Sequence, residues 1–345
     1  MSSIIATLPK VDLYCRLAGA LDVEFLGLLA AECDLPEGND EAALRKALSF
    51  ADPAQFEAVM DWASGLLRRP GAWERAGHRI GNKLIADNVV HAELYVDVGP
   101  GGVEAVAALE ALDRGLVEAL EEDEDAFLSW GFVLQARRGG DVGAFTSLLS
   151  TVLEANLPRF VAIALLGDED LPAAEWAPVM ELAKTHSLGR IVQAGFSGGN
   201  RQVQEAIDMG ASRLLHALRA DRDDGLALHL RAHRLPVVVA PELEVRCGRS
   251  RSLDKHPLAR MREAGLFVVA ASGAPGIMEV ALSDQFELLS RHMKWRLDEM
   301  RNATARAIEA ACIDARLRFT IARAVENWRH RPKLTPGPTD DGYSL

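Results

Sequence analysis

Short apolar segments alternate with longer segments of helical periodicity along most of this chain. Continuous apolar runs are typical of strands buried on both faces, and their alternation with helices indicates a parallel sheet. Eight such runs predict an α/β fold, a single (β/α)8 TIM barrel. The predicted strands are residues 11–14, 89–98, 129–136, 160–166, 189–193, 213–216, 236–240 and 266–271.

The two ends of the chain depart from this simple alternation. Residues 22–87 are helical in pattern throughout, which predicts a helical insertion after the first strand. Residues 272–328 are also helical in pattern and predict a set of C-terminal helices. The prolines and glycines of residues 331–345 predict a disordered tail. We therefore expect one barrel domain, residues 1–330, followed by that tail.

Composition and net charge exclude some classes of binding partner and cellular compartment. The chain has 345 residues, 49% of them hydrophobic, which is enough for the core of one barrel. Its net charge of −12 is repelled by phosphate backbones, so we expect no nucleic-acid partner. We see no signal peptide and no apolar stretch of about 18 residues, so we expect a cytoplasmic protein without a membrane partner. The scattered cysteines form no CxxC pair and fit free thiols in a reducing compartment.

The first predicted strand lies in a segment with a recognisable frame. Residues 8–21 read L-P-K-V-D-L-Y-C-R-L-A-G-A-L. This segment resembles the opening strand of the adenosine deaminase family, whose pattern is L-P-K-x-E/D-L-H-x-H-L-x-G-x-L. Tyr14 and Arg16 stand where the family has its first two zinc-binding histidines, and Ala18 stands where an acidic residue often contacts the ribose.

Two further segments continue the resemblance. Residues 165–169, L-L-G-D-E, are similar to the family's L-A-G-D/N-E turn, in which the glycine, here Gly167, turns its backbone toward the purine. Residues 193–196 read Q-A-G-F where the family has H-A-G-E. Gln193 thus replaces the third zinc ligand, and Phe196 replaces the glutamate that handles protons at the purine ring.

The last two segments extend the resemblance to nearly the whole barrel. Residues 213–217, R-L-L-H-A, match R-I/V-G-H-G and retain His216, which in the family is the base or orienting group for the metal-bound water. The frame that begins at His256 and Pro257 ends in S-G-A-P, where the family has a strand ending in N-T-D-D-P. Gly273 replaces the metal-binding aspartate there, and Ala274 replaces the next one.

The resemblance implies that all four zinc-ligand positions are substituted, by Tyr14, Arg16, Gln193 and Gly273. Zinc needs three or four nitrogen, sulfur or carboxylate ligands, and a permanently charged guanidinium repels the ion. Without the metal, no bound water is brought to a pKa near neutrality. We therefore expect no metal, no other cofactor and no hydrolytic deamination of adenosine.

Arg16 raises a separate question, because a buried guanidinium needs an anionic partner. One reading is an internal ion pair that fills the place of the metal. The other is a site for a substrate carboxylate or phosphate. The candidate protein partners, all near predicted strand ends, are Asp97, Asp168, Glu169 and Glu244.

The candidate site residues follow from this alignment and from side-chain chemistry. A histidine beside a glutamate can act as a general base; the alternative for His216 is a hydrogen-bonded residue of the fold. Phe196 and Tyr14 form an aromatic wall for a planar ligand or fill the vacated space. The catalytic candidates are His216, Arg16, Tyr14 and Glu244, and the ligand-contact candidates are Gly167, Glu169, Gln193, Phe196 and Asp97.

Two functions are compatible with these residues. The first is a metal-independent enzyme, a lyase, isomerase or cyclisation enzyme, acting on a small ligand of the purine or nucleoside kind. The alternative is an inactive pseudoenzyme that binds a ligand or a protein partner. His229 and His233 have the i, i+4 spacing of a chelating pair, but the polar face of a surface helix is the favoured explanation for them.

Overall fold

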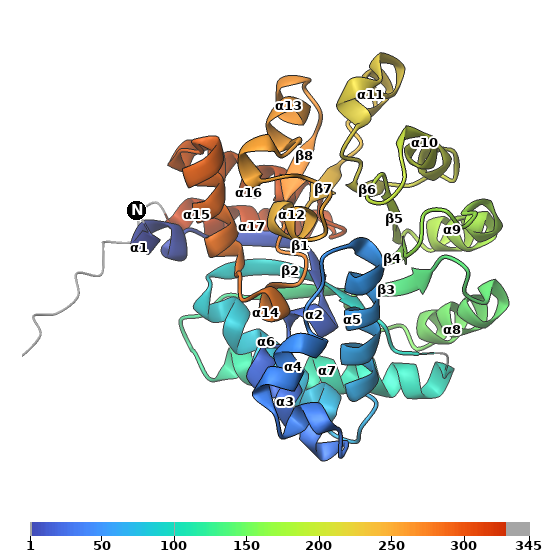
Figure 1. Ribbon diagram of the computed structural model, residues 1–345, viewed down its shortest axis with the longest axis vertical. Helices are drawn as coiled ribbons and strands as arrows, with labels where there is room; N and C mark the ends of the chain where they lie inside the picture. The colour runs from blue at the N-terminus through green and yellow to red at the C-terminus, as the bar shows by residue number, and fades with distance from the viewer. Residues whose placement is uncertain (1, 100, 329–345) are drawn as a thin grey trace, which may run out of the picture.

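The computed structural model describes residues 2–99 and 101–328, and its centre is a closed ring of eight parallel strands (Figure 1). Each strand pairs with the next along the chain, and a bridge between Cys15 and Gly273 joins the last to the first. The prediction of a single (β/α)8 barrel is confirmed. The strands are β1 (Lys10–Arg16), β2 (Val89–Val96), β3 (Ser129–Arg137), β4 (Phe160–Leu166), β5 (Gly189–Ala194), β6 (Arg213–His216), β7 (Val237–Val239) and β8 (Val268–Ala270).

Helices surround this ring on its outside (Figure 1). The crossover helices are α7 (Gly102–Glu121), α8 (Val142–Glu154), α9 (Ala177–Thr185), α10 (Asn200–Asp208), α11 (Asp224–Ala232) and α13 (Leu258–Glu263). The C-terminal helices are α14 (Pro275–Met278), α15 (Leu282–Met293), α16 (Leu297–Ala310) and α17 (Ala315–Trp328). The sequence pattern did not predict α1 (Ser2–Thr7) or α12 (Pro241–Arg246), which follows β7.

The helical insertion between β1 and β2 is divided by aspartates at helix starts. Its helices are α2 (Leu17–Ala20), α3 (Val23–Glu32), α4 (Glu41–Ala47), α5 (Pro53–Leu66) and α6 (Ala72–Ala86). Asp22 and Asp52 each accept a hydrogen bond of 2.8 Å from the backbone N–H three residues on. Asp40 accepts from two backbone N–H groups in the same way. Since a capping carboxylate satisfies donors that have no partner within the helix, these residues decide where α3, α4 and α5 begin.

A buried ion pair closes the end of the barrel opposite the C-terminal strand ends. Arg213 at the start of β6 forms a double hydrogen bond with Glu93 of β2, and both side chains are fully buried. Arg213 also donates to the carbonyl of Ala310, and Glu93 accepts from the backbone N–H of Cys312 at 2.6 Å. The end of α16 and the residues after it therefore seal this side, which leaves function to the other end.

The C-terminal ends of the strands form the barrel mouth, and short helices cover it. Figure 1 draws α2, α5, α12 and α14 in front of the ring, and α2 contacts both α5 and α14. Gly19 of α2 lies so close to α14 that a Cβ atom there would be 2.5 Å from the Cβ of Ala274. The helical insertion thus packs directly on the mouth.

Three remaining expectations concern the chain as a whole. None of the described helices combines the length and the apolar character needed to cross a membrane. The four cysteines are free thiols. The predicted tail, residues 331–345, lies outside the described residues, and the domain boundary near residue 330 stays a prediction.

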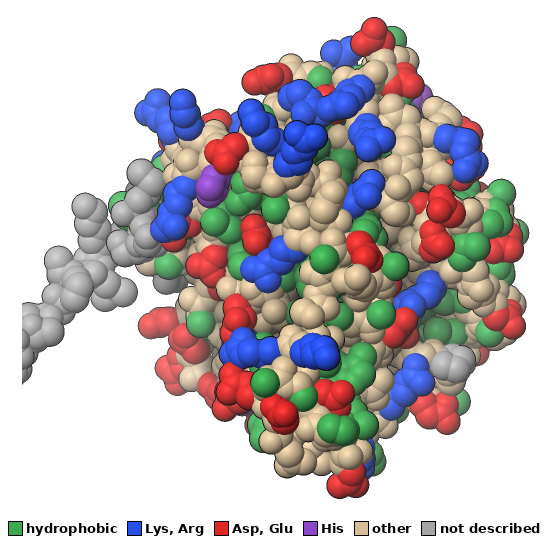
Figure 2. All heavy atoms as spheres, in the orientation of Figure 1, with side chains coloured by type: hydrophobic (Ala, Val, Ile, Leu, Met, Phe, Trp, Pro, Cys, Tyr) green, Lys and Arg blue, Asp and Glu red, His purple; other side chains and the backbone are tan. Residues whose placement is uncertain are grey.

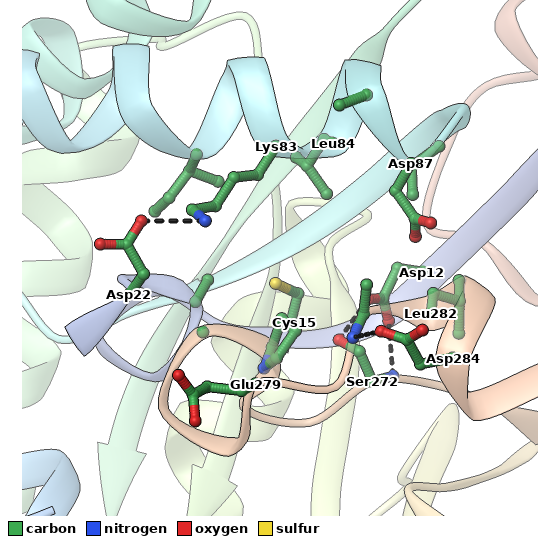
Figure 3. A pocket seen from close by; sticks show the side chains of 17 residues that line it. Asp12, Cys15, Asp22, Lys83, Leu84, Asp87, Ser272, Glu279, Leu282 and Asp284 are labelled. Carbon is green, nitrogen blue, oxygen red and sulfur yellow. Dashed lines mark hydrogen bonds and ion pairs between the residues drawn. The ribbon is translucent and has the colours of Figure 1, made fainter. Parts of the chain in front are cut away.

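A cavity of about 510 Å³ lies outside the barrel, between β1, α6 and the segment from α14 to α15. Figure 3 shows Asp12, Cys15 and Ser272 on its floor. The Asp12 carboxyl group accepts from the backbone N–H groups of Tyr14 and Ser272, both at 3.2 Å, and contacts the Ser272 hydroxyl. Burial raises the pKa of Asp12 to about 6, although these hydrogen bonds act in the opposite direction.

We expect Asp12→Asn to make the protein at least as stable as the wild type at pH 8. The folded-state pKa is raised, so the stability that Asp12 contributes is complete below pH 3.8 and is lost as the pH rises through about 6. This difference is on the order of 3 kcal/mol. Asparagine stays neutral and keeps the same hydrogen-bonding shape. Urea unfolding at pH 4, 6 and 8 measures the effect, and a variant that is destabilised equally at all three values would contradict it.

Candidate active site at the barrel mouth

Aromatic rings form the centre of the barrel mouth. The ring of Phe196 stacks on the imidazole of His216, with centroids 4.0 Å apart and planes 17° apart. Tyr14 meets the same imidazole edge-on, at 5.7 Å between centroids. All three side chains are buried. The structure therefore brings together residues that follow or end β1, β5 and β6, as expected for the C-terminal strand ends of a barrel.

His216 belongs to a buried array of three side chains, which we call the His216–Glu244–His256 array. His216 Nδ1 lies 2.6 Å from one carboxylate oxygen of Glu244, and His256 Nε2 lies 2.5 Å from the other. Burial alone would raise the pKa of Glu244, but the charges and hydrogen bonds of the two histidines outweigh it and hold that pKa at about 2. Glu244 is therefore ionised and fixes the orientation of His216.

The sequence reasoning gave no chemical role to His256, which holds the second oxygen of Glu244. His256 was named only as the first residue of the His-Pro segment that resembles the family pattern. Its spacing of twelve residues from Glu244 crosses a loop and a 3-10 turn, η4 (Leu253–Lys255), so no periodicity joins the two. The His-Pro dipeptide itself was the available signal.

The backbone at His216 is unusual for residues with a side chain. His216 and Ala217 have φ values of +73° and +44°, in the left-handed region that favours glycine. Such conformations cost energy and persist where the surrounding structure holds them. Here the sharp turn after β6 sets the imidazole against Phe196, so the strain coincides with the candidate catalytic histidine.

Several buried polar atoms at the mouth have no hydrogen-bond partner. They are Tyr14 Oη, Arg16 Nε, Gln193 Oε1 and His216 Nε2. Most buried polar atoms in proteins are paired, and an unpaired one is costly. Burial also raises the pKa of Tyr14, with the charge of Arg16 opposing it, so the phenol stays protonated. Two donors, the Tyr14 hydroxyl and the Arg16 Nε–H, and two acceptors, Gln193 Oε1 and His216 Nε2, therefore have no partner within the protein at the mouth.

Arg16 pairs with Glu57 of α5 and with none of the four predicted partners. Its Nη1 lies 2.6 Å from Glu57 Oε1, and its guanidinium lies over the ring of Phe56, 5.3 Å from the centroid. Burial lowers the pKa of Arg16, but Glu57 outweighs burial and raises it above the usual value. The guanidinium is therefore charged, and the geometry favours an internal ion pair over a free anion site.

The predicted partners of Arg16 are occupied elsewhere. Glu244 lies between two histidines, and Asp168 is exposed and accepts from the backbone N–H of Asp170. Asp97 is partly buried and accepts from the backbone N–H of Gly99. Its charge still contributes to the raised pKa of Arg16, so it lies in the neighbourhood of the mouth.

Glu169 anchors the loop that follows β5. Its carboxylate accepts hydrogen bonds of 2.6 to 3.4 Å from four successive backbone N–H groups, those of residues 195–198. A Cβ atom at Gly198 would lie 2.8 Å from this carboxylate. Gln193 donates to the carbonyl of Gly167 at 3.0 Å, which ties the ends of β4 and β5 together. These contacts give Glu169 a positioning role for Phe196, and its role as a ligand contact stays a prediction.

The family resemblance implies a zinc ion at this mouth, and the residues present do not fit one. Arg16 only donates hydrogen bonds and is positively charged, and Gly273 has no side chain. Within residues 2–99 and 101–328, one group of three side chains could hold a metal ion, His78, Glu118 and Glu122 on α6 and α7. The ring centroids of His229 on α11 and His233, its C-cap residue, are 4.3 Å apart, and no third ligand group lies beside them in the described part of the chain.

We expect the Arg16–Glu57 pair to show strong coupling in a double-mutant cycle. Arg16→Met leaves a largely buried carboxylate, so it should cost roughly 2 kcal/mol, and adding Glu57→Leu should recover part of that loss. The matched control is the Arg201–Glu205 pair on the surface, which has the same 2.6 Å separation. Its coupling should stay below about 0.5 kcal/mol. Equal coupling in both pairs, measured by urea unfolding, would contradict the role of burial.

Comparisons with known proteins agree with the fold and correct the functional prediction. The family model described as adenosine deaminase matches residues 9–328. An aminodeoxyfutalosine deaminase of Streptomyces avermitilis is 26% identical over 336 residues, which cover 95% of this chain and 93% of that protein. An adenine deaminase of Rhodospirillum rubrum is 28% identical over 318 residues, 90% of this chain and 93% of that protein. The crystal structure of an adenine deaminase from Arthrobacter aurescens has the same fold, with a TM-score of 0.82, 23% identity and coverage of 94% and 100%.

The relatives overturn the expected function. Proteins that match almost the whole length of this chain are named as deaminases. The predictions of a metal-independent lyase, isomerase or cyclisation enzyme, of no hydrolytic deamination, and of an inactive pseudoenzyme are therefore wrong. They gave too much weight to substitutions at single positions and too little to the class of enzyme that the whole chain resembles. With a family model that spans the barrel and a matching fold, this chain belongs to the adenosine deaminase family.

Proposed function

We propose that this chain is a deaminase of an aminopurine or of a compound derived from one. The observation that carries the proposal is the buried His216–Glu244–His256 array, with His216 Nε2 unpaired at the mouth of a barrel whose full-length relatives are named as deaminases. Purine-type ligands are also consistent with the planar surfaces of Phe196 and Tyr14 at that mouth.

Hydrolytic deamination exchanges an exocyclic amino group for the oxygen of water and releases ammonia. The reaction needs a group that takes a proton from water and returns one to the leaving amine. His216 Nε2 is suited to this task, because Glu244 holds the other ring nitrogen and stabilises the imidazolium that forms. His256 keeps Glu244 in place from the opposite side.

The other mouth residues are suited to orienting the ligand. Tyr14 keeps its phenolic proton and can donate it in a hydrogen bond, because burial raises its pKa. Gln193 offers an unpaired carbonyl oxygen, and Arg16 contributes a fixed positive charge beside them. Asp97 and the backbone of Gly167 complete the set of predicted contacts. Tyr14, Arg16, Gln193 and Gly273 occupy the positions that the resemblance assigns to the zinc-binding residues of the family.

The test is ammonia release from adenine, adenosine, AMP and aminodeoxyfutalosine, with zinc in the buffer so that metal is never limiting. We expect turnover of at least one compound and a fall in kcat of about 100-fold or more in His216→Asn. Glu244→Gln should also lower kcat, because it removes the charge that stabilises the imidazolium. His233→Asn, at the exposed C-cap residue of α11, is the matched control and should keep the wild-type rate. No ammonia from any of the four compounds would contradict the proposal.

A further inference from the structure

Two helices on the outside of the barrel bring a mixed group of metal-binding side chains together. α6 of the helical insertion packs along α7, which connects β2 to β3 (Figure 1). His78 and Asn82 are four residues apart on α6, and Glu118 and Glu122 are four residues apart at the end of α7. Because residues at i and i+4 share one face of a helix, each helix contributes one pair of polar groups to this contact. We call these four residues the α6–α7 cluster.

The side chains of the α6–α7 cluster lie close enough to share one ion. His78 Nε2 lies 2.9 Å from Glu122 Oε1. Asn82 Nδ2 lies 3.3 Å from both the other carboxylate oxygen of Glu122 and His78 Nε2. One ligand atom each of His78, Glu118 and Glu122 lies within 4.8 Å of the other two. Asn82 thus holds Glu122 by one oxygen and leaves the other beside the imidazole, as an outer partner of a metal ligand does.

Glycines allow the two helices to approach this closely. A Cβ atom at Gly77 would overlap the carbonyl oxygen of Leu112, and one at Gly81 would lie 2.6 Å from the Cβ of Ala119. Each of these glycines directly precedes a residue of the α6–α7 cluster. Glycine within a helix is unfavourable relative to alanine, and the close packing of the helices offsets that cost. The backbones that carry the cluster are therefore fixed against each other.

The end of α7 carries negative charge that its neighbours do not neutralise. Glu118 and all of residues 121–125 are acidic and exposed. The last turn of α7 has no basic residue, and the C-terminal end of a helix dipole is itself negative. In the described part of the chain, His78 is the one basic side chain within 4.0 Å of these carboxylates. Figure 2 shows Lys and Arg side chains gathered instead on the face that carries α11 and α13. A bound cation relieves the repulsion at α7.

The ligand atoms of the α6–α7 cluster indicate which cation it takes. One imidazole nitrogen and two carboxylates suit Zn²⁺, whereas Ca²⁺ and Mg²⁺ take oxygen ligands. The hydrogen bonds from His78 and Asn82 lower the pKa of Glu122, so this carboxylate is ionised at neutral pH. Ligands of a tetrahedral zinc ion lie on the order of 3–4 Å from one another. The exposed side chain of Glu118 therefore has only a short distance to move, and water takes the fourth position.

We propose that His78, Glu118 and Glu122 bind one zinc ion, which cross-links α6 of the helical insertion to α7 of the barrel. This site is separate from the barrel mouth. α7 runs from the end of β2 to the start of β3, so its last turn lies toward the opposite end of the barrel. The proposal does not depend on the proposed function, because zinc binding is measured without a purine and without turnover.

The experiment measures the binding of Zn²⁺ to the full chain by calorimetry, after bound metal has been removed with EDTA. The test variants are Glu118→Gln and His78→Gln, each of which removes one ligand. The matched controls are Glu110→Gln, about two turns earlier on α7, and His233→Gln at the C-cap of α11. Both glutamates are exposed and have no ion pair within the described chain. We expect one zinc ion per chain in the wild type and in both controls, and at least about 10-fold weaker binding in both test variants.

Thermal unfolding with and without Zn²⁺ tests the cross-link. A cation that binds only the folded chain raises the Tm, so zinc should raise the Tm of the wild type and of both controls more than that of either test variant. The Tm values without zinc check that all variants are folded.

Three results would contradict the proposal. Equal zinc affinities in the test variants and their controls would overturn the site. Weaker binding in His233→Gln than in His78→Gln would also overturn it, because the metal would then lie at the histidines of α11. Weaker zinc binding in the test variants with the same zinc-dependent rise in Tm as the controls would overturn the cross-link between α6 and α7.

Discussion

The Arg16–Glu57 ion pair is the contact on which the arrangement of the barrel mouth depends. A buried guanidinium at the end of β1 requires a carboxylate, and α5 of the helical insertion supplies it. Glu57 also reaches Arg137 at the end of β3, which pairs with Asp61 one turn further along α5. These alternating charges tie the insertion to two strands. The position of α5 over the mouth therefore follows from a charge that the barrel cannot leave unpaired.

Three carboxylates around the mouth, two of them buried and that of Glu57 partly buried, are stabilised in three different ways. Glu57 has arginines, Glu244 has two histidines, and Glu169 has four backbone N–H groups. Each arrangement immobilises a different element, namely α5, the turn after β6 and the loop after β5. Because their negative charges are used in this way, the polar atoms left over at the mouth belong to Tyr14, Arg16, Gln193 and His216. At the mouth, the polar atoms without a hydrogen-bond partner within the protein are therefore those of the proposed active site.

Much of the barrel could be predicted from the sequence, because buried parallel strands need continuous apolar runs. Each such run can be recognised locally, without knowledge of the tertiary contacts. The short helix α12 was missed because a proline and two glutamates just after a strand look like a loop. The partner of Arg16 could not be predicted, since Glu57 lies 41 residues away and the rotation of α5 depends on packing. A pocket beside the mouth that is lined by Arg219, Arg222, Arg249, Arg251, Lys255 and Arg260 could not be predicted for a related reason. These residues are spread over positions 219–260, and only the fold of the loops brings them together.

Gly273 bears on how this branch of the family could have diverged. It has a φ of +78°, and a Cβ atom there would lie 3.0 Å from Leu243 and 3.1 Å from Ala240. The other three substituted positions already carry long side chains, so exchanges at those sites disturb no backbone. An aspartate at 273, by contrast, would adopt a left-handed backbone conformation and would require Leu243 and Ala240 to shift by a few tenths of an ångström. A side chain at 273 therefore carries a local conformational and steric cost that exchanges at the other three positions do not.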